Sequence, residues 1–405
     1  MRAAIGALAA ALAVSAALSA QSQPTAGLTQ EDAVTIALAS NKTITAARLR
    51  HPVDLAGVDV ARERPNPDVT YEATKETPRQ AVGLQLPVEL GGKRGARTAA
   101  AQAAVATGDA ETDQIIAGVV DDVRRAYIMH EGAIRRAALA EEIAGLFTRA
   151  RDAAHARYEA GDVPRRDDVA SQADWLGAQN DVTAARGEVD ATRASLNVLL
   201  GRPPDATLTL APAGGVAAVP DLATALSRAE QMNADLQVID RQIAEQTARI
   251  NVARSLQKPD LGVGGGISFD AEPDFSVGWR ANFGVTVPLF TTHKAGVLVE
   301  TAEMQRLAAQ REAVRADIGA AVAAALARAA AAQAQVTAYD RDILPLTQQD
   351  EAFAQDAYQS GQTGIDALIL ALEHARERRL AGLQARLDFE FALADLERAI
   401  RGPAR

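Results

Sequence analysis

The chain has 405 residues, a length that by itself would allow two or three ordinary domains. Hydrophobic residues make up 48% of the chain, but aromatic residues only 4%, because many of the hydrophobic residues are alanines. This composition favours long, closely packed helices over a large aromatic core. The 42 basic and 52 acidic residues give a net charge of −10, which argues against nucleic acid as a partner, and the lack of cysteine excludes disulfides, thiolate metal sites and a lipidated N-terminal cysteine.

The N-terminal residues have the pattern of a secretory signal peptide. Arg2 precedes an uncharged, mostly apolar run that ends near Ala20, and polar residues follow. We therefore expect residues 1–20 to be a signal peptide, with a retained membrane anchor as the alternative. No later run offers the roughly 20 apolar residues of a transmembrane helix, but an exported chain can also span a membrane with alternating strands of about 9 to 11 residues.

A series of features recurs in the same order at a nearly fixed spacing. Pro67-Asp68 returns as Pro259-Asp260, Leu86-Pro87-Val88 as Val287-Pro288-Leu289, Tyr158-x-x-Gly161 as Tyr358-x-x-Gly361, and Gly201-Arg202-Pro203 as Arg401-Gly402-Pro403. We expect two copies of one structural unit, residues 21–202 and 221–405. The segment between them, 203–220, is rich in Pro, Gly and Ala and is predicted to be a linker.

Each unit is predicted to contain short helices, two strands, a long helix, a tight turn and a return helix. Alternating apolar and polar residues predict strands within 69–73 and 82–90 of the first unit and within 261–269 and 275–289 of the second. The chain has no proline from Lys93 to Tyr158, which predicts a continuous helix about 100 Å long.

The return helices have the apolar spacing of coiled coils. After a turn at Gly161 and Pro164, apolar positions spaced three and four residues apart predict a helix from 165 to 200. These positions are Val182, Ala185, Val189, Thr192, Leu196 and Leu199. In the second unit a long helix from 295 to 358 contains Pro345, which should interrupt it, and the return helix repeats the spacing. Its apolar positions are Phe389, Leu393, Leu396 and Ile400.

Four strands cannot close a barrel, and an open sheet edge in lipid would leave backbone polar groups unpaired, so a membrane-spanning chain of this kind must oligomerise. Two copies give a nearly filled barrel, whereas three give 12 strands and a lumen. Small polar residues such as Gly262, Gly264 and Asn282 favour the water-filled trimer. We therefore expect a mainly α chain with a small β part, whose trimer forms a 12-stranded outer-membrane β-barrel continuing into a long periplasmic α-helical tunnel. The alternatives are a soluble β-sandwich and an ordinary elongated coiled coil.

From Leu28 to Pro403 these features resemble the TolC-type outer-membrane factors, the trimeric exit ducts of tripartite efflux and secretion systems. The resemblance implies a homotrimer in outer-membrane lipid that works with a periplasmic adaptor and an inner-membrane pump. The family tip motif, Tyr-x-x-Gly with a carboxylate a few residues later, matches Tyr158, Gly161 and Asp167, and again Tyr358, Gly361 and Asp366, where the carboxylate comes one residue earlier. The resemblance implies that both tips contact the adaptor.

The tip carboxylates Asp167, Asp168 and Asp366 have two interpretations. The resemblance implies acidic residues that face the pore axis and close the periplasmic aperture. The alternative is a favourable charge in the first turn of each return helix, which needs no further role.

The run Glu89-Leu90-Gly91-Gly92-Lys93-Arg94, with Arg97 beyond it, resembles the CzcC-like branch of this family. That branch implies export of cobalt, zinc, cadmium, nickel or copper with a proton-driven pump of the RND type. Drug efflux, type I secretion and a soluble periplasmic coiled-coil adaptor are the alternatives. Lys93, Arg94 and Arg97 either face the membrane interface or lie in a solvated turn.

The sequence offers no candidate for catalysis, cofactor binding or metal binding. The five histidines are far apart and none has the spacing of a metal-ligand pair. They are His51, His130, His155, His293 and His374. No nucleophile motif is present either, so a secreted enzyme is the least favoured class.

Overall fold

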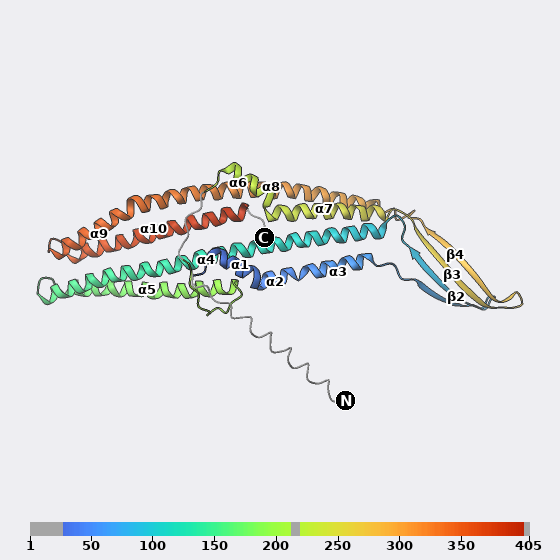
Figure 1. Ribbon diagram of the computed structural model, residues 1–405, viewed down its shortest axis with the longest axis horizontal. Coiled ribbons are helices and arrows are strands. Elements are labelled where there is room, and N and C mark those ends of the chain that lie inside the picture. The colour runs from blue at the N-terminus through green and yellow to red at the C-terminus, as the bar shows by residue number, and fades with distance from the viewer. Residues whose placement is uncertain (1–26, 212–218, 401–405) are drawn as a thin grey trace, which may run out of the picture.

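The computed structural model describes residues 27–211 and 219–400 (Figure 1). The signal peptide expected at 1–20, the middle of the predicted linker and Arg401-Gly402-Pro403 lie outside the described residues. The described chain is mainly helical and elongated, with one antiparallel sheet at one end and two helical hairpins at the other. No described helix is both long enough and apolar enough to cross a membrane.

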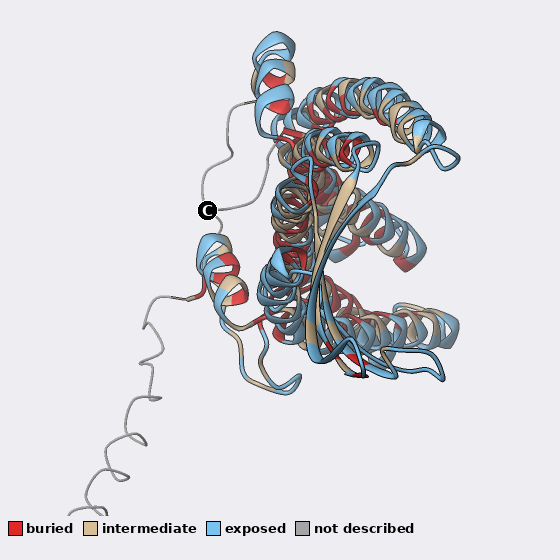
Figure 2. Ribbon diagram, turned by 90° about the vertical axis from the view of Figure 1, so that its right-hand side faces the viewer, coloured by how far each residue is buried: buried red, intermediate tan, exposed pale blue. Residues whose placement is uncertain are grey.

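Helix α4 (Lys93–Glu159) runs through most of the length of the molecule and confirms the predicted unbroken helix. On the sheet side it lies in a layer ordered α3, α4, α7, α8, and on the hairpin side in a layer ordered α5, α4, α10, α9. Viewed along the long axis, the buried residues lie mostly where neighbouring helices face one another, whereas the strands are mostly exposed or half-buried (Figure 2). The other helices of the two layers are α3 (Arg50–Arg62), α5 (Arg165–Leu199), α7 (Ala234–Ser255), α8 (Lys294–Ala338), α9 (Leu344–Gln359) and α10 (Ile365–Ile400).

Short helices pack beside the ends of the return helices, and two asparagines fix them there. Asn41 caps α2 (Lys42–Arg48) and its Nδ2 donates to the carbonyl of Leu199 at 2.7 Å. Asn233 caps α7 and donates to the carbonyl of Ala399 at 3.1 Å. The same contact therefore occurs at the end of α5 and at the end of α10. The remaining short helices are α1 (Gln30–Ser40) and α6 (Leu222–Met232).

The hairpins are held together by apolar contacts at the predicted coiled-coil positions. Val182, Ala185 and Leu196 of α5 are buried, as are Phe389 and Leu396 of α10. Between α4 and α10, ion pairs along the two helices accompany apolar contacts such as the cluster of Ile128 with Leu387 and Ala394. These pairs are Arg124–Glu397 (2.8 Å), Arg135–Glu390 (3.0 Å) and Glu142–Arg379 (2.6 Å).

The long helix predicted for residues 295–358 is interrupted next to Pro345, as expected from the sequence. A π-helix, Tyr339–Ile343, separates α8 from α9, and Pro345 is the second residue of α9. The Leu344 N–H bonds to the carbonyl of Tyr339, one residue further back than in an α-helix. Pro345 cannot donate a backbone hydrogen bond, which explains why the helical register changes here.

The sheet contains four strands in the order β1-β2-β3-β4, all antiparallel. Its register places apolar residues on one face, as in the cross-strand row Tyr71, Val82, Ile267 and Trp279. The strands are β1 (Asp68–Ala73), β2 (Gln80–Val88), β3 (Asp260–Ala271) and β4 (Phe275–Thr286). Among the described residues, β1 and β4 each have a neighbouring strand on one side only.

The opposite face of the sheet is polar and built around glycines. Asn282 Nδ2 donates to Gln85 Oε1 at 2.8 Å, and the two side chains meet over Gly264 of the intervening strand. A Cβ on Gly264 would come within 2.5 Å of both side chains, so only glycine leaves room for this contact. Arg280 and Glu72 also pair across this face, at 3.3 Å. The sheet therefore has one apolar and one hydrogen-bonding surface.

Candidate functional site: the hairpin tips and the strand-to-helix junction

The two hairpins end in the same backbone turn. Gly161 and Gly361 have φ values of 82° and 73°, a left-handed conformation that glycine adopts without strain. In the first tip the Gly161 N–H bonds to the carbonyl of Tyr158 and the Asp162 N–H to that of Arg157. The second tip repeats this pair of bonds around Gly361. Both turns are Schellman motifs, so the Tyr-x-x-Gly pattern sets the end of each outgoing helix.

The tips touch each other through a residue that the motif does not contain. Arg157 donates to the carbonyl of Tyr358 at 3.2 Å, and its guanidinium carbon lies 4.8 Å from the centroid of the Tyr358 ring. Tyr358 is 1% exposed, whereas Tyr158 is 37% exposed. Burial raises the pKa of Tyr358, Arg157 opposes that shift, and the Asp167 carboxylate adds to it. The two tyrosines of the motif therefore have different environments.

The three tip carboxylates also have different surroundings. Asp167 and Asp168 lie in the first turn of α5, and Asp366 lies in the first turn of α10. Asp168 Oδ1 lies 3.0 Å from His155 Nδ1, so this carboxylate joins the two helices of its own hairpin.

Asp366 belongs to an acidic group that spans both hairpins. Burial raises the pKa of Asp174, and the charges of Glu373 and Asp366 raise it further. Asp174 comes from α5, while the other two carboxylates come from α10. Carboxylates from the two return helices are therefore close enough to influence one another electrostatically.

The strand-to-helix junction begins with two left-handed glycines. Gly91 and Gly92 have φ values of 73° and 76°, and Gly92 caps the start of α4. The Lys258 side chain lies against Gly91, with its Nζ 3.2 Å from the Gly91 carbonyl oxygen, and a Cβ on Gly91 would meet that side chain at 2.4 Å. The glycines therefore let the chain turn from β2 into α4 and leave room for the Lys258 side chain, which comes from the loop before β3.

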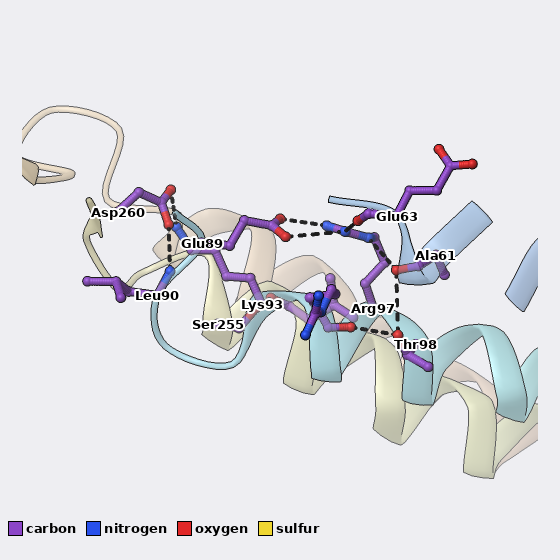
Figure 3. A network of polar contacts seen from close by, with 11 residues as sticks. Ala61, Glu63, Glu89, Leu90, Lys93, Arg97, Thr98, Ser255 and Asp260 are labelled. Atoms are coloured by element: carbon purple, nitrogen blue, oxygen red, sulfur yellow. Dashed lines mark hydrogen bonds and ion pairs between the residues drawn. The ribbon is translucent and has the colours of Figure 1, made fainter. Parts of the chain in front are cut away.

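Lys93 connects the start of α4 to the start of the next strand. Its Nζ lies 2.6 Å from Asp260 Oδ2, and the Leu90 N–H donates to Asp260 Oδ1 at 3.2 Å (Figure 3). The Lys93 side chain is only 9% exposed. Asp260 thus binds a buried ammonium group and a backbone N–H of the turn at the same time.

Arg97 connects the junction to the end of α3. Its guanidinium makes two hydrogen bonds to the Glu89 carboxylate, at 2.7 and 3.3 Å, and also donates to the carbonyls of Ala61 and Glu63 (Figure 3). The bonds to Glu89 raise the pKa of Arg97. Arg94 is exposed, and its side chain has no partner among the described residues. Neither interpretation of Lys93 and Arg97 from sequence included these ion pairs.

Replacing Arg97 with alanine should destabilise the junction by about 1 to 3 kcal/mol, because Glu89 loses its partner and two carbonyls lose a donor. The matched variant Arg94→Ala removes the same side chain from an exposed position and should change stability by less than about 0.5 kcal/mol. Thermal unfolding in detergent measures both. Equal unfolding temperatures for the two variants would show that the Arg97 contacts do not stabilise the fold.

The described histidines do not gather into a metal site. Over residues 27–211 and 219–400, no group of three His, Asp or Glu side chains has the arrangement needed to hold a metal ion. His155 contacts Asp168 at 3.0 Å and Glu159 at 3.4 Å through opposite ring nitrogens. His51 contacts Asp109 at 2.6 Å, and His130 contacts Thr192 at 3.0 Å.

The fold is that of outer-membrane channel proteins. It matches the structure described as the outer-membrane channel OprN with a TM-score of 0.77 and 18% sequence identity, over 92% of this chain and 90% of the other. The chain belongs to the outer membrane efflux protein family, whose model matches residues 33–202 and 225–402.

Two curated relatives are metal-resistance proteins. The cobalt-zinc-cadmium resistance protein CzcC of Cupriavidus metallidurans is 30% identical over 272 residues, which span 65% of this chain and 63% of that protein. The nickel-cobalt-cadmium resistance protein NccC of Alcaligenes xylosoxydans xylosoxydans is 28% identical over 316 residues, spanning 73% of this chain and 68% of that protein. These matches confirm the resemblance to this family and to its CzcC-like members that the residues of the junction indicated.

Proposed function

We propose that three copies of this chain form an outer-membrane channel with a 12-stranded barrel and a periplasmic helical tunnel. The observation that carries the proposal is the sheet, which has an exposed apolar face, a polar face and two unpaired edges. Edge-to-edge pairing of β4 with β1 of the next copy satisfies the backbone of both edges. The apolar face then meets lipid and the glycine-rich polar face lines the lumen.

The helix layer supports the same closure, because apolar side chains are exposed on both of its margins. On α5, Val169 and Leu176 are 53% and 54% exposed, and on α9, Leu346 and Phe353 are 63% and 71% exposed. Each pair is one heptad apart, the spacing of a coiled-coil contact. Packing α5 of one copy against α9 of the next covers both pairs in a head-to-tail contact that a ring can close.

The two structural units, 21–202 and 221–405 with the linker 203–220, remain part of this proposal. The family model matches the chain in two segments, and each segment contains two strands followed by a long helical hairpin. The equivalent contacts of Asn41 and Asn233 support the same division. We also keep the signal peptide at 1–20, which would direct export to the outer membrane.

Within this channel we assign a passive role in metal efflux. The names of the two relatives support divalent metals such as cobalt, zinc, cadmium and nickel as cargo, with copper as a further candidate. A periplasmic adaptor and an inner-membrane RND pump would supply the energy and the selection. The adaptor would contact the hairpin tips at Tyr158, Gly161, Tyr358 and Gly361, the end of the molecule opposite the sheet.

Deletion of the gene should lower the cobalt, zinc or cadmium concentration that its host tolerates, and the wild-type chain should restore it. A complementing variant with Gly161 and Gly361 both changed to Val should fail to restore growth, because valine is strained at a left-handed position and alters the tips. Immunoblots of outer-membrane fractions check that the variant is present. Unchanged metal tolerance in the deletion strain, together with increased sensitivity to organic toxicants, would contradict the metal assignment.

Of the three carboxylates expected at the aperture, we propose that Asp167 and Asp366 lie near the pore axis, while Asp168 is held by His155. The conductance of the reconstituted channel should become less cation-selective in Asp167→Asn and Asp366→Asn, because each substitution removes three charges from the trimer. Asp168→Asn is the matched control, since Asp168 is already engaged with His155. If the control alters selectivity as much as the other two variants, or if none does, the assignment is wrong.

A further inference from the structure

The junction that follows β4 is similar to the junction that follows β2 at its last residue, although Gly91 is left-handed and its counterpart Thr292 is not. Lys294 is the first residue of α8, as Lys93 is of α4. The residues before these lysines, His293 and Gly92, both cap their helices in a left-handed conformation, with φ values of 54° and 76°. The two lysines therefore occupy the same position at the start of their helices.

The surroundings of these two lysines differ. Lys93 is 8% exposed and pairs with Asp260, the first residue of β3, the strand hydrogen-bonded to β2. Lys294 is exposed, and its side chain has no partner among the described residues. Within residues 27–211 and 219–400, no strand pairs with β4 on its outer side, because β4 is the last strand of the sheet. The position that Asp260 occupies for Lys93 is empty for Lys294.

An equivalent aspartate is present at the other edge of the sheet. Asp68 is the first residue of β1, follows a proline as Asp260 does, and is exposed without a side-chain partner in the described chain. Because all neighbouring strands are antiparallel, β1 and β3 run in the same direction. A second copy placed with its β1 against β4 would therefore bring its Asp68 to the end of β4 where α8 begins.

We propose that Lys294 of each protomer binds Asp68 of the next protomer, and that the Thr291 N–H donates to the same carboxylate. This inference rests on the trimer proposed above. It repeats across the subunit boundary the contacts of Lys93 and the Leu90 N–H with Asp260. Three such ion pairs set the register between β4 and β1 of neighbouring copies, since a slip of one residue would move the aspartate to the other face of the sheet.

The opposite charges of Lys294 and Asp68 suit a contact that forms between protomers. An ammonium group that becomes covered on assembly needs an anionic partner, and a carboxylate at the beginning of the adjacent strand provides it, as it does for Lys93. A lone protomer keeps both groups in water, so they oppose neither its folding nor its solubility.

The absence of cysteine in the chain allows a direct test. The double variant Asp68→Cys with Lys294→Cys, treated with a short bis-maleimide in membranes, should give covalent dimers and trimers on denaturing gels. The matched double variant Lys93→Cys with Asp260→Cys should cross-link within one chain and remain monomeric, and each single variant should not cross-link. Light scattering of the same samples in detergent reports whether trimers are present.

The outcomes separate the inference from the proposed trimer. Trimers by light scattering without Asp68–Lys294 cross-links would overturn the ion pair and leave the channel proposal standing. Monomers for the wild-type chain as well would overturn both.

Charge reversal gives a second measurement. Lys294→Asp should speed dissociation of the trimer on heating several-fold, and adding Asp68→Lys should restore the wild-type rate. Arg94→Asp, at an exposed position without a partner, controls for the added negative charge. If the double reversal dissociates as fast as Lys294→Asp alone, the two residues do not pair.

Discussion

Trp279→Arg is expected to block stable insertion of the protein into membranes. Trp279 is 84% exposed on the apolar face of the sheet, in the middle of β4, where the proposed channel meets lipid. An arginine on the lipid face of a barrel costs about 2 to 4 kcal/mol near the bilayer midplane, and each trimer would carry three. The variant should therefore leave the outer-membrane fraction and accumulate as degraded or soluble material.

The control is Asn282→Arg, on the same strand but on the polar face. An arginine there would face the lumen of the proposed channel, where it could donate to Gln85, so membrane insertion should match that of the wild type. Fractionation followed by alkaline extraction measures both variants. Normal insertion of Trp279→Arg together with loss of Asn282→Arg would reverse our assignment of the two faces.

Tyr358→Ala is expected to destabilise the hairpin tips and to raise the conductance of the closed channel. The ring is 1% exposed, packs with Phe147 and Leu372, and lies beneath Arg157. Truncating a buried aromatic side chain to alanine typically costs about 3 to 5 kcal/mol, through lost contacts and the cavity that remains. The tips should therefore separate more readily, which planar-bilayer recordings and thermal unfolding would detect.

Two further variants serve as controls for Tyr358→Ala. Tyr158→Ala changes the equivalent residue of the first tip, which is 37% exposed, and should have a much smaller effect. Tyr358→Phe removes a buried hydroxyl that has no hydrogen-bond partner in the described structure and keeps the ring, so stability should be unchanged or slightly higher. Equal loss of stability in Tyr158→Ala and Tyr358→Ala would show that contact between the tips is not the cause.

The long helices, their turns and the four strands could be predicted because local signals define them. Each of these signals depends only on residues close together in the sequence. Examples are the stretch without proline after Lys93, the glycines at the tips and the alternation along β4. Pro345 likewise predicted the interruption, although the change to π-helical register was not anticipated. Such features require no knowledge of which segments become neighbours.

The contacts between distant segments could not be predicted in this way. Arg157 meets Tyr358, and Lys93 meets Asp260, only because the two halves of the chain lie side by side. The tip motif gave no sign that one of its two tyrosines would be buried and the other exposed. The separate surroundings of Asp168 and Asp366 depend on the same long-range arrangement.

The open outer edges of β1 and β4 have a consequence for biogenesis. Before it joins the proposed trimer, a protomer presents free backbone donors and acceptors along both outer edges of its sheet, and these edges can also pair with a wrong partner. Correct assembly therefore competes with aggregation at a rate that rises with the periplasmic concentration of monomer. If the proposed trimer is the native state, the melting temperature should depend on protein concentration, as it does for obligate oligomers.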